Sequence, residues 1–401
     1  MAMGEAGRAG PVTDRIELLD ALRGFALFGI LLANILYWSG WVLVPDPAML
    51  KVASADTVHA QHLFHYALID GKFYTLFSLM FGIGFSLQLT RLERRGADGV
   101  RIFRRRVLIL LGFGLVHMVF VWDGDILTLY ALLGLLLPFF RTWSDRRLLV
   151  AALLLILSPI AGVALFEALG WAPHRALYAF GDGIGASLGG TPTDPVGWLQ
   201  RADPQAFVSW VLGGWPYSIG TRLESWRIPK VLGIMLIGMM LGRRLAAGSL
   251  LADRRKLWAA LLAGLAVGGP LSILYALTPR AGQASLPAIL GTVPLALAYA
   301  AAFVLLWDRA RPVLRVFVWP GRMALTNYLS HSLLGIILFY GIGFGLIGRL
   351  GPAGFYGIAV AIFASQILFS RWWLARFGQG PMERLWRRLT YGSPAGTPAA
   401  A

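Results

Sequence analysis

The stretch GLVHMVFVWDGDILTLY, residues 114–130, places a histidine and two carboxylates inside an otherwise almost wholly apolar run. His117, Asp123 and Asp125 lie within nine residues of one another. Ionisable groups at membrane depth are costly, and they commonly serve a function. A carboxylate that orients His117 would let its imidazole act as a general base or acid. In the structural alternative, Asp125 caps the following helix, Asp123 lies in water, and His117 bonds to a backbone carbonyl.

A second candidate region is the first apolar run, LLDALRGFALFGILLANILYW, residues 18–38. Asp20 and Arg23 are three residues apart, so the spacing predicts an ion pair on one helical face. Asn34 follows Arg23 by eleven residues, about 16 Å along a helix, which sets it near the depth of His117. There it would stabilise a developing oxyanion. The alternatives are an interfacial arginine and an asparagine that joins two helices.

A third polar strip lies in GRMALTNYLSHSLLGIILFY, residues 321–340. Asn327 and His331 are four residues apart and share a helical face, and Arg322 precedes them at the edge of the apolar run. Such a strip would line a cavity that admits a phosphate-bearing ligand, because guanidinium suits phosphate. The alternative is hydrogen bonding between helices, which these residue types commonly supply.

The fourth region, HAQHLFHYALIDGK at residues 59–72, repeats histidine at a spacing of three. His59, His62 and His65 would spread over a wide helical arc and have no obvious fourth ligand. We therefore expect a solvated, pH-responsive loop and no metal site. The sequence also lacks a phosphate-binding P-loop, a dinucleotide fingerprint, a zinc-protease motif and a nucleophile elbow.

The composition sets the class of protein. Of 401 residues, 57% are hydrophobic and 14% are charged, and cysteine is absent. Runs of about 18–25 apolar residues recur, each long enough to cross a hydrocarbon core. We predict an all-α, polytopic transmembrane helix bundle that forms one integral membrane domain of about ten spans. The predicted spans are 21–38, 73–90, 107–122, 126–141, 147–169, 229–247, 256–277, 288–307, 323–347 and 354–374.

The formal net charge of +16 is explained by the basic residues in the connections between the predicted spans. Basic residues fill every second connection, and because cytoplasmic loops collect lysine and arginine, we predict that both termini are cytoplasmic. This distribution favours a membrane protein over a nucleic-acid-binding one. The prediction gives a cytoplasmic segment 1–18, a long periplasmic loop 170–228 with a re-entrant piece at 206–220, and a cytoplasmic tail 376–401.

Several segments together resemble one family. They are LRGFALFGILLANI, KFYTLFSLMFGIGF, VHMVFVWDGDILTLYALLG, GRMALTNYLSHS and RFGQGPMERLWRRLTY. In this order they resemble the YeiB-type bacterial inner-membrane proteins, domain of unknown function 418. The resemblance reaches from about residue 15 to 392 and implies a multi-pass protein of the bacterial inner membrane.

A more remote likeness concerns LDALRG and the helix that follows it. This segment is similar to the first span of the transmembrane acyltransferases, which include the acyltransferase-3 enzymes and the heparan α-glucosaminide N-acetyltransferase type. In the former group a catalytic histidine stands about three turns after the arginine, where this chain has Asn34. The latter type has an asparagine there and a histidine in the next outer loop, a role for which His59 and His62 compete with His117.

These observations favour transfer of an acyl group across the membrane. A cytoplasmic acyl-CoA, used as a cosubstrate without a tightly bound cofactor, would meet Arg23, Arg105 or Arg322. His117, oriented by Asp125, would deprotonate a hydroxyl or amine of a small-molecule or glycan acceptor. Two other functions remain open: a proton-coupled transporter of a small polar or carbohydrate-like solute, and a non-catalytic membrane component. The sequence leaves the oligomeric state undetermined.

Overall fold

The computed structural model describes residues 11–43, 49–251, 253–279 and 281–392, and within these ranges the chain is helical and contains no β-strand. The predicted all-α fold is confirmed. The outermost parts of the two predicted cytoplasmic segments, residues 1–10 and 393–401, lie outside the described residues.

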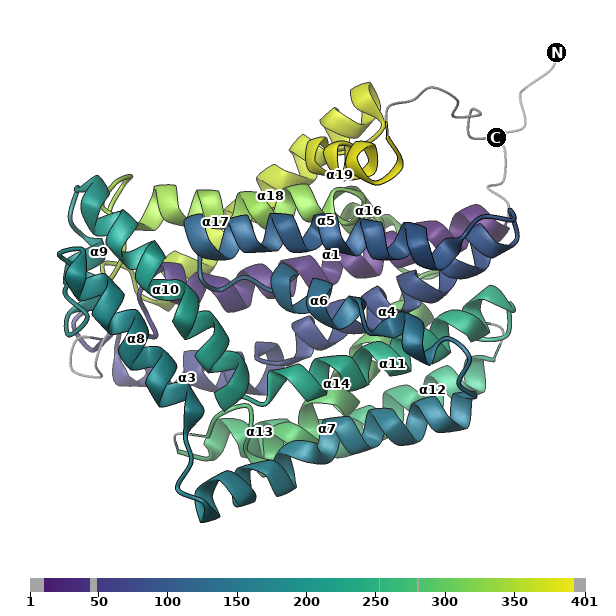
Figure 1. The fold of residues 1–401 in the computed structure, drawn as a ribbon, viewed down its shortest axis with the longest axis horizontal. Coiled ribbons are helices and arrows are strands. Elements are labelled where there is room, and N and C mark those ends of the chain that lie inside the picture. Colours follow the sequence, from purple (N-terminus) through teal and green to yellow (C-terminus); the bar gives the residue numbers. More distant parts are fainter. Residues whose placement is uncertain (1–10, 44–48, 252, 280, 393–401) are drawn as a thin grey trace.

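Most of the long helices run roughly parallel to one another, and the helices formed by residues 173–224 lie together at one end of the bundle (Figure 1). The first half contains α1 (Pro11–Trp38), α3 (Ala55–Phe64), the π-helix η1 (His65–Ile69), α4 (Lys72–Glu93), α5 (Gly99–Phe120), α6 (Leu127–Gly134), the 3-10 helix η2 (Leu137–Phe140), α7 (Asp145–Ala168), α8 (Pro173–Ser187) and α9 (Pro195–Leu199). The second half contains α10 (Pro204–Glu224), α11 (Arg227–Ala246), α12 (Arg254–Ala263), the π-helix η3 (Gly264–Gly268), α13 (Gly269–Leu277), α14 (Leu286–Leu306), α15 (Arg311–Leu314), the 3-10 helix η4 (Arg315–Phe317), α16 (Val318–Arg322), α17 (Ala324–Phe339), α18 (Pro352–Phe377) and α19 (Pro381–Tyr391).

Short polar side chains fix where several helices begin. Asp98, Ser144 and Asp253 stand at the N-caps of α5, α7 and α12, and each accepts a hydrogen bond from a backbone N–H of the first turn. Such a cap satisfies a donor that has no partner inside the helix. The sequence therefore marks the boundaries between the apolar runs with ordinary capping chemistry.

Glycine lets the two central helices, α4 and α11, approach closely. A Cβ placed on Gly82 of α4 would collide with the backbone carbonyl of Met235, and one placed on Gly238 of α11 would collide with that of Leu79. Small residues at crossing points permit this packing in membrane proteins. Gly84, two residues further on, is different, because a Cβ placed there would have no neighbouring heavy atom within 4 Å.

This difference gives a matched pair of variants. Gly82→Ala should destabilise the protein by about 1–3 kcal/mol, because the added methyl forces two backbones apart. Gly84→Ala should leave stability unchanged or raise it slightly, since alanine is the better helix former. Unfolding midpoints of the purified protein, followed by tryptophan fluorescence, measure both effects. Equal midpoints for the two variants would contradict the close approach of α4 and α11.

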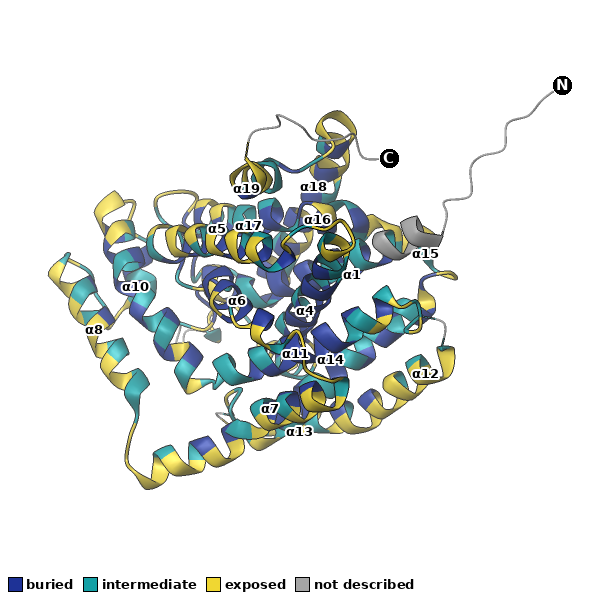
Figure 2. Ribbon diagram, turned by 45° about the vertical axis from the view of Figure 1, so that its right-hand side comes forward, coloured by how far each residue is buried: buried dark blue, intermediate teal, exposed yellow. Residues whose placement is uncertain are grey.

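The outer helices expose apolar side chains. Within the described residues, six helical segments are long and apolar enough to cross a membrane: 17–38, 55–93, 145–168, 254–277, 286–306 and 352–377. The segment containing α12 and α13 is only 17% buried, and Figure 2 shows exposed residues along it and along α7. Leu153, Leu154 and Ile273 are among the exposed residues. Apolar surface of this extent fits contact with hydrocarbon, so this is a membrane protein.

The remaining four predicted spans fall on α5, on α6 with η2, on α11 and on α17. These helices are shorter or carry more charge than the six segments above. That they also cross the membrane, and that both termini are cytoplasmic, stay predictions.

The predicted long loop 170–228 is largely helical. It forms α8, α9 and α10, and α10 extends beyond the predicted re-entrant piece at both of its ends. Pro204 begins α10, where proline loses no hydrogen bond. Pro216 lies inside the same helix. The Gly and Pro content, which favoured a broken segment, is thus compatible with a continuous helix. Helix α10 also contributes Arg222 to the candidate site.

Helix α19 packs against the N-terminal end of α17 (Figure 1). Its Glu383 accepts hydrogen bonds from the backbone N–H groups of Leu325 and Thr326, at 2.7 and 3.1 Å. A carboxylate at this position neutralises the positive end of the helix dipole. Trp386 of α19 donates to the backbone oxygen of Arg106 in α5. The C-terminal helix thereby joins two helices that also contribute to the candidate site.

Candidate functional site

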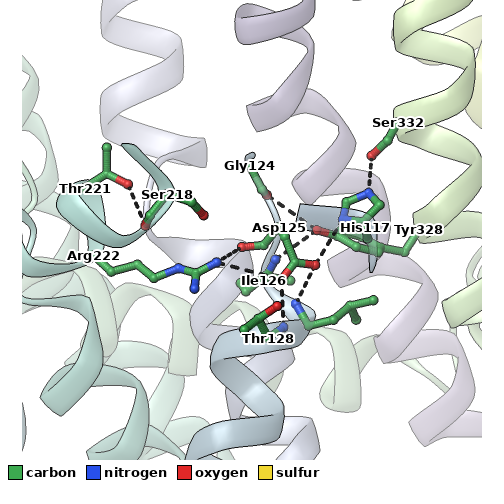
Figure 3. A network of polar contacts seen from close by, with 11 residues as sticks. His117, Gly124, Asp125, Ile126, Thr128, Ser218, Thr221, Arg222, Tyr328 and Ser332 are labelled. Carbon is green, nitrogen blue, oxygen red and sulfur yellow. Dashed lines mark hydrogen bonds and ion pairs between the residues drawn. The ribbon is translucent and has the colours of Figure 1, made fainter. Parts of the chain in front are cut away.

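His117 lies near the C-terminal end of α5 and is 2% exposed. Its Nδ1 is 3.0 Å from Oδ1 of Asp125, and its Nε2 is 2.9 Å from Oγ of Ser332 in α17 (Figure 3). Both ring nitrogens therefore have partners. A neutral imidazole that donates from Nδ1 to Asp125 and accepts the Ser332 hydroxyl proton at Nε2 satisfies every group.

Asp125 occupies the turn between α5 and α6 and has two roles at once. Its Oδ1 and Oδ2 accept hydrogen bonds from the backbone N–H groups of Leu127 and Thr128, at 3.1 and 2.7 Å. The same carboxylate contacts His117. The helix-capping alternative and the orienting role are thus compatible, because one carboxylate has enough acceptor positions for both.

Arg222, near the C-terminal end of α10, approaches the turn from the side opposite to His117 (Figure 3). Its guanidinium donates to the backbone oxygen of Asp125, and one of its nitrogens is 3.7 Å from Oδ2. Both side chains are buried, at 7% and 0% exposure. This cation compensates the buried carboxylate, which would be costly to hold alone.

Tyr328 of α17 holds the turn from a third direction. Its hydroxyl accepts a hydrogen bond from the backbone N–H of Ile126 at 3.1 Å and lies 3.5 Å from the backbone oxygen of Gly124. Its ring centre is 5.4 Å from that of His117. Three separate helices therefore determine the position of the imidazole and its carboxylate.

The arrangement Asp125–His117–Ser332 has the connectivity of a serine catalytic triad. In such a triad the carboxylate orients the imidazole, which accepts the proton of the hydroxyl nucleophile. None of the three residues is more than 5% exposed. A substrate can reach the Ser332 hydroxyl only after a local opening of the helices or of the turn at residues 121–126.

Asp123 lies in the same turn but belongs to another environment. It is half-buried beside α10, where a Cβ placed on Gly214 would lie 2.9 Å from its Cβ. Burial raises the pKa of Asp123 to about 6, against hydrogen bonds from backbone N–H groups that lower it. The expectation of a fully solvated Asp123 therefore does not match its surroundings.

The predicted site residues of the first span, Arg23 for ligand binding and Asn34 for catalysis, form no hydrogen bond with this network. Arg23 donates to Asp20 at 2.7 Å and approaches the backbone oxygen of Gly321 at 3.4 Å. The predicted ion pair of Asp20 and Arg23 is thus confirmed. Asn34 is half-buried on α1, and the structure gives its side chain no hydrogen bond to His117 or Ser332. Its oxyanion role stays a prediction.

Two other arginines proposed for phosphate binding lie at the opposite end of the helices. Arg105, in the N-terminal half of α5, and Arg322, at the end of α16, are both exposed. Arg322 approaches the backbone oxygen of Gly378 at 3.5 Å. Exposure leaves both guanidinium groups accessible to an anionic ligand, and their role stays a prediction.

The Asn327 and His331 strip contacts α18. His331 bonds to Oε1 of Gln366 at 2.7 Å, and Asn327 donates to Oγ of Ser370 at 2.9 Å. Both residues are at most 1% exposed. This is the interhelical bonding that the sequence left as the alternative, and in this state the strip lines no open channel. Nδ1 of His331 is nevertheless buried without a hydrogen-bond partner.

The three histidines of the segment 59–72 form no contact with His117. His59 and His62 are exposed on α3, and His62 contacts the backbone oxygen of Ala276 at 3.1 Å. His65, in η1, is buried. Among the described residues, no group of three histidine or acidic side chains has the geometry to hold a metal ion.

Sequence reasoning missed Ser332, Arg222 and Tyr328. Ser332 immediately follows His331, but consecutive side chains of a helix are about 100° apart around its axis. Ser332 therefore lies on a different face from Asn327 and His331, which was the face selected from the sequence. Arg222 lies in the segment that was predicted to be a loop. The available signal was the position of Arg222 just after the apolar stretch 206–220, because a buried arginine needs an acidic partner.

The fold and the buried polar network define a multi-helical membrane protein with a candidate active site between α5, α6, α10 and α17. A family described as "Protein of unknown function (DUF418)" matches residues 241–393. The chain is 32% identical to "Uncharacterized protein YxaH" of Bacillus subtilis (strain 168), with 94% of each chain covered. It is 30% identical to "Uncharacterized protein YeiB" of Escherichia coli (strain K12), over 94% of this chain and 96% of that relative. The chain belongs to the DUF418, or YeiB-type, family.

Proposed function

We propose that this protein is an acyltransferase of the bacterial inner membrane. It transfers an acyl group from a cytoplasmic acyl-CoA to a hydroxyl or amine acceptor, such as a glycan or another small molecule, on the periplasmic side. The observation that carries the proposal is the buried sequence of contacts Asp125–His117–Ser332, with distances of 3.0 and 2.9 Å. This geometry suits a hydroxyl nucleophile with an oriented general base.

The reaction has two steps in this proposal. Oγ of Ser332 attacks the thioester carbonyl while Nε2 of His117 takes the hydroxyl proton, and the C–S bond then breaks as coenzyme A leaves with that proton. The acceptor hydroxyl or amine next attacks the acyl-serine ester and gives its proton to His117, which returns it to Ser332. Asp125 stabilises the imidazolium that forms in both steps, and Asn34 would stabilise the oxyanion.

The acyl donor would approach from the arginine-rich end. The CoA phosphates would bind Arg23, Arg105 or Arg322, since guanidinium forms bidentate hydrogen bonds with phosphate. Ser332 lies eight residues after the start of α17 at Ala324, about 12 Å along the helix. The acyl-pantetheine arm would therefore follow α17, past Asn327 and His331, after α17 and α18 separate.

A covalent probe tests the nucleophile without knowledge of the acceptor. Protein purified in nanodiscs is treated with a fluorophosphonate, or with radiolabelled acyl-CoA, and the modified peptide is identified by mass spectrometry. We expect the label on Ser332 and its loss in Ser332→Ala. Ser330→Ala is the matched control, because Ser330 stands two residues away and bonds to Gln366 instead of His117. No label from either reagent, together with full cellular activity of His117→Ala, would reject the acyltransferase.

The alternative function is proton-coupled transport. It is favoured by one observation: Arg222, Asp125 and His117 form a continuous buried network of ionisable groups between helices. Such networks serve as proton relays in transporters. Solute uptake into proteoliposomes that depends on a proton gradient, without any thioester, would support transport over acyl transfer. A protein inactive in both assays would be a non-catalytic membrane component.

A further inference from the structure

A second buried polar cluster lies apart from His117, where the N-terminal ends of α4 and α11 meet residues 281–285. It contains three cations, Lys72, Arg227 and Lys230. We propose that this cluster is a binding site for a phosphate monoester group. The proposal is independent of the acyl-transfer mechanism, because it rests on different residues and on a binding measurement.

Lys72 opens α4 and is fully buried. Its Nζ donates to the backbone oxygen of Tyr66 at 2.7 Å and lies 5.6 Å from the ring centre of Tyr275. Tyr66 belongs to the π-helix η1. Single π-turns inside helices are frequent at functional sites. A buried lysine ammonium has three donors, and the structure gives this one a single hydrogen bond.

Arg227 and Lys230 stand three residues apart on α11 and both reach Gln283. Lys230, which is 5% exposed, donates to the backbone oxygen of Gln283 at 2.7 Å. Arg227 approaches Oε1 of the same residue at 3.4 Å and lies over the ring of Tyr74. Its Nε is buried without a hydrogen-bond partner. Polar atoms of this kind are rare in folded proteins unless a ligand or water completes them.

The carboxylate of Asp70 belongs to this cluster but forms no ion pair with the three cations. Asp70 accepts hydrogen bonds from Tyr275 at 2.8 Å and from Gln283 at 2.7 Å. Among the described residues, no carboxylate comes within 4.0 Å of Lys72, Arg227 or Lys230. With all three side chains protonated, three cations beside one carboxylate carry a formal excess of two positive charges.

A phosphate monoester matches this excess. It carries a charge of about −1.5 to −2 near neutral pH and has three strong acceptor oxygens. Arginine and lysine are the side chains that bind phosphate, by a fork of donors and by a point charge respectively. A carboxylate ligand would neutralise only one of the two charges. Charge and donor number therefore favour the phosphate group.

The cluster adjoins an open cavity of about 440 Å³. Its lining includes Trp226 and Ala284, which are the chain neighbours of Arg227 and Gln283. Trp226 has φ +50°, the left-handed conformation that non-glycine residues rarely adopt. Strained backbone of this kind is concentrated at ligand sites and switches. Glu167 and Glu224 also line the cavity, and Lys72, Arg227 and Lys230 do not, so the cavity lies beside the cluster and is not part of it.

Ligand-dependent stability tests the site. Protein in neutral phosphatidylcholine nanodiscs is titrated with glycerol 3-phosphate, with sodium chloride at matched ionic strength as reference. A ligand that binds only the folded state raises the unfolding midpoint. We expect stabilisation by glycerol 3-phosphate, and its loss in Arg227→Gln and Lys230→Met. The matched control is Lys51→Met, which removes an exposed lysine and should respond as wild type.

A second arm identifies the source of the phosphate. Nanodiscs that contain phosphatidic acid present the same monoester on a lipid. Stabilisation by phosphatidic acid alone assigns a lipid headgroup, and stabilisation by glycerol 3-phosphate assigns a soluble ester; both support the site. Lys230→Met should fold at least as stably as wild type in phosphate-free buffer, because it removes a buried cation with no acidic partner. No stabilisation by either probe, or undiminished stabilisation in both variants, would overturn the proposal.

Discussion

Replacing His117 by glutamine is expected to lower the rate at which Ser332 reacts with a fluorophosphonate by about 10³–10⁴-fold. Glutamine keeps a polar side chain near Ser332 but cannot accept the hydroxyl proton. The nucleophile then loses its general base, while the fold loses little volume. The measurement is the pseudo-first-order labelling rate of purified protein in nanodiscs.

The same experiment separates a catalytic role for His117 from a structural one. Asp125→Asn should also slow labelling, because the amide replaces one carboxylate oxygen by an N–H donor and removes the negative charge, so that the imidazole tautomer is no longer fixed. In the His117→Gln background, Asp125→Asn should add little further loss, since residues that act as a unit have non-additive effects. His62→Gln, an exposed histidine on α3, is the control and should label at the wild-type rate. If the two substitutions lowered the labelling rate independently, so that their effects multiplied in the double variant, His117 and Asp125 would not act as a unit.

Asp125→Ala is expected to reduce the free energy of unfolding by about 3–5 kcal/mol. The substitution leaves the guanidinium of Arg222 buried without its acidic partner at 3.7 Å. It also removes the carboxylate that accepts the N–H groups of Leu127 and Thr128 at the start of α6. Both losses occur in buried surroundings, so water cannot replace the missing contacts.

Unfolding midpoints measured by tryptophan fluorescence in detergent check this prediction. Asp98→Ala provides the comparison, because Asp98 also caps a helix but in exposed surroundings; its loss should cost about 1 kcal/mol. The double variant Asp125→Ala with Arg222→Met should recover part of the stability, since the unpaired cation is then gone. Similar midpoints for Asp125→Ala and Asp98→Ala would mean that the Arg222 contact contributes little.

Local sequence determined several features before any packing was known. The content and length of the apolar runs predicted an all-helical membrane protein, because only helices satisfy their own backbone groups across such runs. The motif segments identified the YeiB-type family, which the relatives confirm. The three-residue spacing of Asp20 and Arg23 predicted their ion pair. The nearness of His117 and Asp125 in the chain also made their meeting a local event across a single turn.

The tertiary structure decided what completes each site. Ser332 is 215 residues from His117, and Arg222 is 97 residues from Asp125. Lys72 of α4 and Lys230 of α11 belong to different helices and are linked only through Tyr275, Asp70 and Gln283. It also decided that Asn327 and His331 contact α18 in this state. Helical periodicity tells which residues share a face, but the neighbour of that face depends on how separate helices pack. Helix packing depends on the shapes of many side chains together and on close contacts such as that at Gly82. No single motif in the sequence therefore reveals which helices will be neighbours.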